Sequence, residues 1–175
     1  SVRSPKTAPA VPSNLRAKPR SSNSVELTWT DNSVNEDGFY IYQKKEGEAD
    51  FVKLSITALP RTGTGSISSH YITGLEEGAS YIYKVSSYNN GGESGTTAEA
   101  TTYVYLNAPY NLSAIADSTG NIKLAWQDNS TKEQGVEIWR REAEEASVKI
   151  GEVLTADVTS YVDDDPDIKP DTTYS

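Results

Sequence analysis

The stretch Val25-Glu26-Leu27-Thr28-Trp29-Thr30-Asp31-Asn32-Ser33 decides the fold of this 175-residue chain. Apolar and polar residues alternate from Val25 to Trp29, which is the period of a β-strand with one buried face. The Asp-Asn-Ser run that follows is a turn signal. At an offset of 97 positions the chain repeats the same alternation and the same turn as Ile122-Lys123-Leu124-Ala125-Trp126-Gln127-Asp128-Asn129-Ser130. A strand and its turn therefore occur twice in the sequence.

The repeat extends to both sides of this stretch without a gap. Because chance does not produce such agreement, we predict two copies of one unit of ~97 residues. The predicted organisation is a lead-in over residues 1–8, a first domain over 9–104 and a second over 105–175, with a short join near Tyr103–Pro109. Identical residues outside the quoted stretch, given by their positions in the first copy, are Pro12, Asn14, Leu15, Ala17, Glu36, Gly38 and Ile41.

Each copy is predicted to be all-β. Turn signals rich in Gly, Asn and Asp separate short runs of β-forming residues, and no stretch shows the 3.6-residue period of a helix. Seven short strands in ~95 residues are typical of a β-sandwich. Besides the strand at Val25–Trp29, the strands expected in the first copy are Phe39–Tyr42, Phe51–Leu54, Ser66–Ile72, Tyr81–Tyr88 and Thr96–Val104, with a further one near Pro12–Ala17.

An ordered set of motifs in the first copy resembles the fibronectin type III domain. The motifs are Pro12-x-Asn14-Leu15-x-Ala17, Leu27-x-Trp29-x-Asp31, Gly38-x-x-Ile41, Leu75-x-x-Gly78-x-x-Tyr81-x-x-x-Val85 and Asn89-x-x-Gly92-x-Ser94. The resemblance implies an A-B-E sheet packed on a C-C′-F-G sheet. It also implies that Trp29 is a core residue and that Tyr81, beside Leu75, is the tyrosine-corner residue at the start of strand F. Trp126 and Tyr174 are the matching residues of the second copy. The immunoglobulin Cys…Trp…Cys signature is absent, which excludes an antibody-type domain.

The second copy is predicted to lack strands F and G as written. In the first copy 23 residues follow Tyr81 up to Val104, whereas one residue follows the matching Tyr174. Leu124, Trp126 and Ile138 are then expected to face water. Three interpretations stay open: the sequence is part of a longer protein, another chain supplies the strands by β-augmentation, or the second copy is unfolded.

Composition excludes several function classes. The chain has 25 acidic and 16 basic residues, a net charge of −9, which disfavours nucleic acids and anionic membranes. It has no window of ~18 apolar residues that would insert into a membrane. There is no cysteine, and His70 is the single histidine, so the copies cannot each carry a Ser-His-Asp or cysteine nucleophile. We predict no enzyme and no cofactor, and we expect His70 to be a dispensable surface residue whose counterpart is Ser160.

A few side chains are candidates for binding. Tyr42 and Trp139 occupy matching positions and are expected to point outward, where they would stack on a sugar or a protein or pack across the sheet. Asp163, Asp165 and Asp167 are weak candidates for Ca²⁺ ligands, the alternative being a solvated turn. The recurring Asp31…Glu36 and Asp128…Glu133 pairs are read as a cation or glycan loop, or as acceptors of backbone N–H groups in a turn.

The sequence therefore favours a non-catalytic spacer or scaffold module of a larger extracellular or cell-surface protein, and the missing cysteines favour a bacterial type. Its partners would be neighbouring domains of the same polypeptide or a surface assembly. One alternative is an adhesive module that binds polysaccharide or protein; another is a fragment of a fibre completed by strand donation. Leu59–Gly63 matches the Leu-Pro-x-Thr-Gly sortase signal but is followed by a whole domain, so a turn is predicted there.

Overall fold

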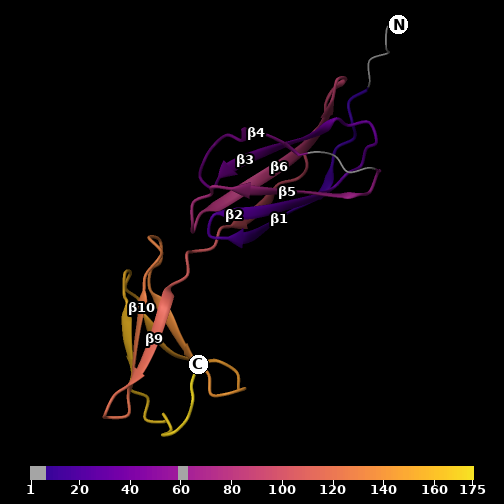
Figure 1. Ribbon diagram of the computed structural model, residues 1–175. Helices are drawn as coiled ribbons and strands as arrows, with labels where there is room; N and C mark the ends of the chain where they lie inside the picture. The colour runs from indigo at the N-terminus through magenta and orange to yellow at the C-terminus, as the bar shows by residue number, and fades with distance from the viewer. Residues whose placement is uncertain (1–6, 59–62) are drawn as a thin grey trace. The chain divides into compact units, whose positions relative to one another are not determined.

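The computed structural model describes residues 7–58 and 63–175. In this part of the chain every regular element is a β-strand, so the predicted all-β fold class is confirmed. The chain divides into two compact units, Ser1–Tyr105 and Leu106–Ser175, called unit 1 and unit 2 below (Figure 1). The predicted turn at residues 59–62 and the first six residues of the predicted lead-in lie outside the described residues.

Unit 1 is a sandwich of two antiparallel sheets. One sheet has the strand order β1-β2-β5, and the other has the order β4-β3-β6, with β7 and β8 both paired to β6. This is the predicted arrangement of A-B-E on C-C′-F-G. The strands are β1 (Ser13–Ser21), β2 (Ser24–Thr30), β3 (Gly38–Lys45), β4 (Val52–Ala58), β5 (Ile67–Thr73), β6 (Ser80–Asn89), β7 (Gly92–Glu93) and β8 (Ala100–Tyr103).

The core of unit 1 follows from the alternation in β2. Val25, Leu27 and Trp29 point inward and are at most 1% exposed. The Trp29 ring meets the Phe39 ring edge to face at a centroid distance of 5.2 Å, an arrangement that aromatic pairs prefer. Other wholly buried side chains are Ile41, Tyr83, Val85 and Val104, which come from β3, β6 and the end of β8. Strands β6 and β8 therefore seal the core.

The tyrosine corner is formed in both units. The Tyr81 hydroxyl accepts the backbone N–H of Glu76 at 3.2 Å, and the Tyr174 hydroxyl accepts that of Lys169 at 2.9 Å. An ion pair lies at the same corner in both units, but the basic and the acidic residue have swapped positions. Lys45 pairs with Glu76 at 2.6 Å in unit 1, and in unit 2 Glu142 pairs with Lys169 at 2.8 Å. The match of Tyr174 to Tyr81 thus holds in three dimensions.

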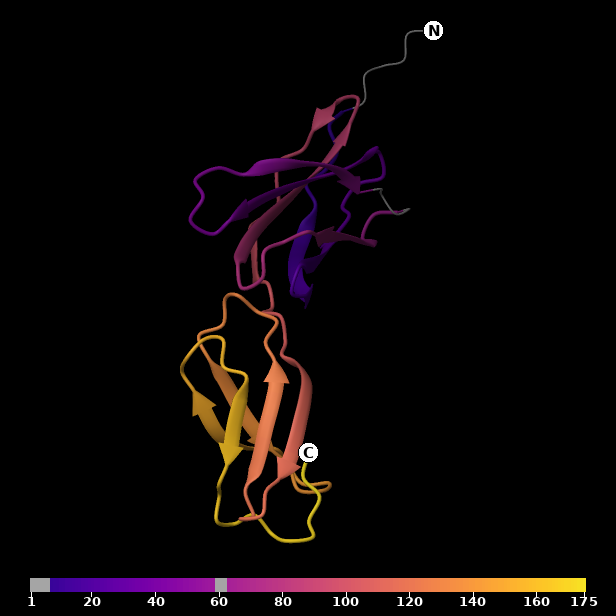
Figure 2. The same cartoon turned by 60° about the vertical axis from the view of Figure 1, so that its left-hand side comes forward.

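Unit 2, all of whose residues are described, has five strands. In one sheet β10 (Ile122–Gln127) lies between β9 (Tyr110–Ala116) and β13 (Ser160–Asp163). The other sheet pairs β11 (Val136–Arg140) with β12 (Val148–Val153). Figure 2 shows the first three strands in one layer with β11 and β12 behind them. These strands correspond to A, B and E and to C and C′.

Strand F is represented in unit 2 by its first contacts with the strand-C segment. A single bridge joins Glu142 to Tyr174, and the next pair, Arg141 and Ser175, exchanges two backbone hydrogen bonds of 2.8 and 2.9 Å. These contacts match the pairs at the start of β6 in unit 1, where Lys45 lies opposite Tyr81. The inner edge of β11 beyond them has no neighbouring strand in unit 2.

The strand register corrects one predicted correspondence. Leu27 lies opposite His70 in unit 1, and Leu124 lies opposite Tyr161 in unit 2. The counterpart of His70 is therefore Tyr161, and the prediction that Ser160 replaces it is wrong by one residue. A shift of one position exchanges the two faces of a strand, so the error matters for every side chain of β13.

Candidate functional site

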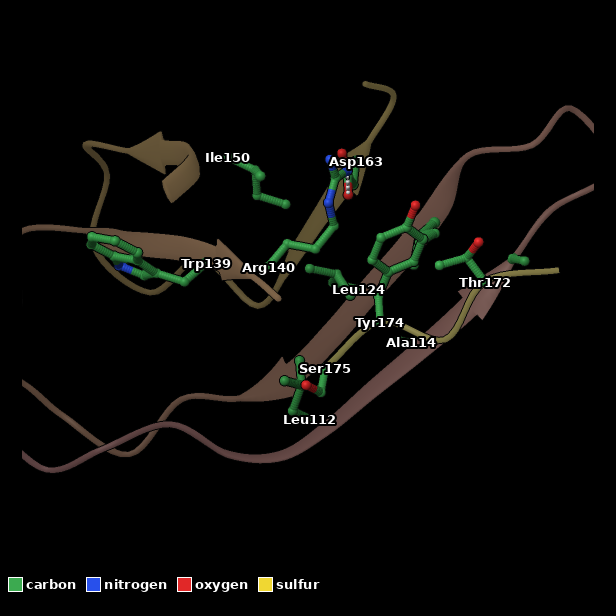
Figure 3. A pocket seen from close by; sticks show the side chains of 12 residues that line it. Leu112, Ala114, Leu124, Trp139, Arg140, Ile150, Asp163, Thr172, Tyr174 and Ser175 are labelled. Atoms are coloured by element: carbon green, nitrogen blue, oxygen red, sulfur yellow. Dashed lines mark hydrogen bonds and ion pairs between the residues drawn. The ribbon is translucent and has the colours of Figure 1, made fainter. Parts of the chain in front are cut away.

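Unit 2 has an open groove between its two sheets. A cavity of about 260 Å³ lies there, with Leu112 and Leu124 on one sheet, Arg140 on the other and Tyr174 at its rim (Figure 3). A second cavity of about 190 Å³ continues along Trp126, Val136 and Ile138. In unit 1 the corresponding edge of β3 is paired with β6, and β8 lies near β1. The groove is therefore the place that strands F and G occupy in unit 1.

The exposure of equivalent side chains measures this opening. Trp29 is 1% exposed, whereas its counterpart Trp126 is half-buried. Leu112 on β9 is 68% exposed, and Leu124 is half-buried. Ile138 departs from the expectation that it faces water, because it is only 6% exposed. The two sheets of unit 2 still pack on one another around Ile138, and the opening lies to its side.

A charged group spans the groove. The Arg140 guanidinium on β11 reaches Asp163 at the end of β13 at 2.7 Å and Asp165 at 2.9 Å, and it lies 5.1 Å from the centre of the Tyr174 ring (Figure 3). Burial alone would lower the pKa of Arg140, but its hydrogen bonds with the two carboxylates raise it. In unit 1 the two positions hold Gln43 and Ile72. At the edge of the core, unit 2 thus has an ion pair where unit 1 has an apolar residue.

The acidic run at residues 163–167 is bound by this arginine. Asp163 is only 3% exposed, so the alternative of a solvated turn is wrong for this residue. Asp165 accepts the backbone N–H of Asp167 at 2.9 Å, and this bond, followed by the contact with Arg140, lowers its pKa. Asp167 itself is exposed. The sequence did indicate that Asp163 is buried, since the alternation of its strand places this residue on the inward face.

The turns after β2 and β10 contain the recurring acids. Asp31 accepts the backbone N–H of Ser33 at 2.9 Å, and Asp128 accepts that of Ser130 at 3.1 Å. The predicted structural role, acceptance of backbone N–H groups in the turn, is therefore present in both units. Asp157, which sequence reasoning did not single out, joins Asp128 and Glu133 in a group whose ligand oxygens all lie within 4.8 Å of one another. It comes from a distant loop, so spacing in the sequence could not reveal it.

The two candidate aromatic residues differ in their surroundings. Tyr42 is half-buried, its hydroxyl is hydrogen-bonded to Glu93, and Lys53 pairs with the same carboxylate at 3.1 Å. Burial, followed by the bond with Glu93, raises the pKa of Tyr42. Trp139 is 53% exposed and its indole N–H donates to Glu137 at 3.3 Å. Cross-strand contacts thus account for Tyr42, and only Trp139 presents a largely open ring.

His70 lies in a shallow groove of unit 1 rather than on a fully open surface. It is half-buried and lines the groove together with Leu54 and Ile72. Burial lowers the pKa of the imidazole. His70 is therefore half-buried rather than on the open surface that was expected, and its dispensability stays a prediction.

The described residues contain no helix of the length and apolar character that would span a membrane. Comparison with known proteins adds the following. The family model described as fibronectin type III domain matches residues 10–103. Chitinase A1 of Niallia circulans is 29% identical over 133 residues, a match that covers 69% of this chain and 17% of the chitinase.

Solved structures are similar at low sequence identity. The FN1-FN3 domains of chicken CNTN1 are 17% identical with a TM-score of 0.46, over 95% of this chain and 59% of that one. The FN5 domain of Drosophila Lar is 18% identical with a TM-score of 0.43, over 57% of this chain and 99% of that one. The chain spans less than a fifth of the length of the chitinase, whose match covers 17% of that protein.

Proposed function

Because this chain belongs to the fibronectin type III family, we propose that it is a non-catalytic spacer segment of a larger extracellular protein. Domains of this family are commonly spacers or modules in multidomain proteins such as chitinases. The partial match to a chitinase from Niallia circulans supports a bacterial parent protein with further domains. Neighbouring domains of the same polypeptide are then the partners of this segment.

The observation that carries the proposal is the path of the chain through unit 1. The Thr7 carbonyl accepts the side-chain amides of Asn35 and Asn89 at 3.1 and 2.9 Å, so the chain arrives at the end of β6. It leaves after Val104, which exchanges backbone hydrogen bonds with Gly78 and Ala79 at the start of β6. Since β6 has ten residues at ~3.3 Å each, arrival and departure are roughly 30 Å apart. A sealed core between these points keeps the separation fixed.

Unit 2 supports a tandem of two such modules. Asn14 and Asn111 both have a φ of 55°, in the left-handed region that asparagine tolerates better than most residues. The Asn14 amide donates to Thr30 at 3.2 Å, and the Asn111 amide donates to the matching Gln127 at 2.9 Å. Shared backbone detail of this kind, together with the two tyrosine corners, favours a second domain of the same family.

The spacer proposal is tested by a distance measurement on spin labels. The chain has no cysteine, so Glu46→Cys with Asn90→Cys introduces the only two thiols, one beside each end of β6. We expect a narrow distribution of distances centred at roughly 30 Å plus the length of the labels. The control is Val34→Cys with Asn90→Cys, which labels a single end and should give a short distance. A broad distribution for the first pair would contradict a rigid spacer.

The non-catalytic part of the proposal has its own test. We expect no release of sugar from chitin oligosaccharides by the chain, and no change in that result with His70→Ala. Turnover that is abolished by His70→Ala would overturn the proposal, because His70 is the single histidine of the sequence.

A further inference from the structure

The turn of residues 31–37 between β2 and β3 and the turn of residues 128–135 between β10 and β11, called the acidic loops below, leave carboxylate oxygens without partners. Asp31 is 0% exposed. Its Oδ1 accepts a backbone N–H, but its Oδ2 has no hydrogen-bond partner among the described residues, and the same holds for the buried Oε2 of Glu36. A buried oxygen of this kind destabilises the fold if nothing binds it.

The two residues of unit 1 stand at the positions of Asp128 and Glu133 in unit 2, five residues apart in the turn after the second strand. Asp128 and Glu133 have ligand oxygens within 4.8 Å of one another, which indicates the same approach of Asp31 and Glu36. Carboxylate oxygens are all hydrogen-bond acceptors, so two of them that face each other need a proton or a cation between them. The pair in unit 1, in which Asp31 is fully buried and Glu36 half-buried, therefore indicates a shared proton or a bound cation.

The acidic loop of unit 2 favours a cation as that ligand. There the group has three carboxylates, because Asp157 joins Asp128 and Glu133, with all ligand oxygens within 4.8 Å. The backbone N–H of Asp157 donates to Glu133 Oε1 at 3.0 Å. Glu133 Oε2 is buried and has no hydrogen-bond partner among the described residues. A single shared proton does not neutralise such a group.

The spacing of the oxygens fits a calcium-sized ion. Oxygen ligands lie ~2.3–2.6 Å from Ca²⁺, so two ligands of one ion are at most about 5 Å apart. Ca²⁺ also accepts irregular sets of carboxylate and backbone oxygens, whereas Mg²⁺ demands a near-octahedral set. Residues 105–175 carry 14 acidic and 6 basic side chains, which makes the surroundings of the second loop strongly negative.

We propose that the acidic loops are binding sites for a hard divalent cation of the calcium class, with Asp128, Glu133 and Asp157 in unit 2 and Asp31 and Glu36 in unit 1. The site with three carboxylates binds more tightly than the site with two. We expect a dissociation constant of ~10⁻⁴–10⁻³ M for the tighter site, the range of extracellular calcium modules. Bound cation would fix the turns that join the two sheets of each unit.

The test is calorimetric titration of the full chain with CaCl₂ in KCl, after treatment with a chelator. We expect two ions per chain. Glu133→Gln keeps the acceptor for the Asp157 N–H but removes the charge, and it should weaken the tighter site by at least tenfold. Glu36→Gln should remove the weaker site. The control is Glu144→Gln, which removes one exposed negative charge of unit 2 and should leave both sites unchanged.

Several results would decide against the proposal. Absence of calcium-dependent heat up to ~10 mM, ten times the upper end of the expected range, would overturn it. Equal losses in Glu133→Gln and Glu144→Gln would also overturn it, since they would show a general attraction to an acidic surface. One ion that is lost with Glu133→Gln would confirm the site in unit 2 and overturn the site in unit 1. Circular dichroism of each variant checks that it is folded.

Discussion

Trp29 and Trp126 occupy the same position on the second strand of their units, and they differ in what covers them. Trp29 is sealed at 1% exposure by strands β6 and β8, whereas Trp126 is half-buried beside an open groove. The strands beneath them have the same alternation, and both units have the tyrosine corner and the same turn after the tryptophan. Residues 106–175 thus have the same local structure as the matching part of unit 1, and their groove lies open where strands β6 and β8 close the core of unit 1.

The comparison separates two contributions to the fold. Local sequence sets the strands, the turns and the left-handed asparagine at the first strand. Closure of the core depends on strands that come from the last quarter of the domain, because they extend the sheet of β3 and cover the inner face of the β1-β2-β5 sheet. Burial of a large apolar side chain contributes roughly 1.5–3 kcal/mol, and a whole domain is stable by only ~5–15 kcal/mol. Partial loss of burial at a few positions therefore removes a large share of the stability of a domain.

The largest predicted difference concerns the two tryptophans. Trp29→Ala should destabilise unit 1 by roughly 3–5 kcal/mol, as other large-to-small core substitutions do. Trp126→Ala should destabilise unit 2 by less, about 2 kcal/mol, because part of the Trp126 side chain is already in contact with water in the folded chain. Hydrogen exchange of the β2 and β10 amides in the full chain measures the loss of stability in each unit. A cost for Trp29→Ala under about 1 kcal/mol would contradict its place in the core.

The next difference concerns the ion pair that crosses the groove. Arg140→Gln should destabilise unit 2 by about 3 kcal/mol, since it leaves the buried Asp163 carboxylate without its partner. Arg140→Gln with Asp163→Ile restores the two residues found in unit 1 and should be neutral or stabilising. Protection of the β13 amides reports on both variants. A double variant as unstable as Arg140→Gln alone would show that the ion pair is not what holds this edge.

A smaller effect is predicted for His70. His70→Ser should cost about 1 kcal/mol, the centre of the distribution for point substitutions, because the imidazole is half-buried beside Leu54 and Ile72. Tyr161→Ser is the matched change in unit 2, where the Tyr161 hydroxyl donates to the Ile150 carbonyl at 3.2 Å. Chemical denaturation of the full chain measures the change in the free energy of unfolding for both variants. No loss for His70→Ser would restore the view of a dispensable surface residue.

The smallest effect is a pH dependence in unit 2. The Thr119 hydroxyl and backbone N–H hold the pKa of Asp117 at about 2, below its usual value near 3.8. A depressed pKa contributes stability that is present above about pH 4 and is lost as the pH falls to about 2. Asp117→Ala should therefore reduce protection of the β9–β10 turn at pH 6 and change little at pH 2. An equal loss of protection at pH 6 and pH 2 would contradict hydrogen bonds that depend on the ionised Asp117 carboxylate.

Alternation and turn residues predicted the strands because they are local properties, whereas the two-sheet arrangement was implied by the resemblance to the fibronectin type III domain. The resemblance also placed Trp29, Leu75 and Tyr81 in the core of unit 1, where they are at most 8% exposed. It assigned the wrong register to β13, since a one-residue slip cannot be seen from isolated Ser and Tyr matches. The Arg140–Asp163 pair joins two strands of different sheets, and the approach of Asp157 to Glu133 joins two loops, so both depend on segments that are distant in sequence. Such contacts emerge only when both sheets are in place.

The most direct test of the role of closure is hydrogen exchange of the full chain, with and without a 23-residue peptide copied from Ile82–Val104. We predict that the β10 and β11 amides are protected at least roughly a hundredfold less than those of β2 and β3, which corresponds to about 3 kcal/mol. The peptide carries the sequence of the strands that close unit 1, and it should raise protection in unit 2 selectively. Equal protection of the two units without the peptide would contradict the account.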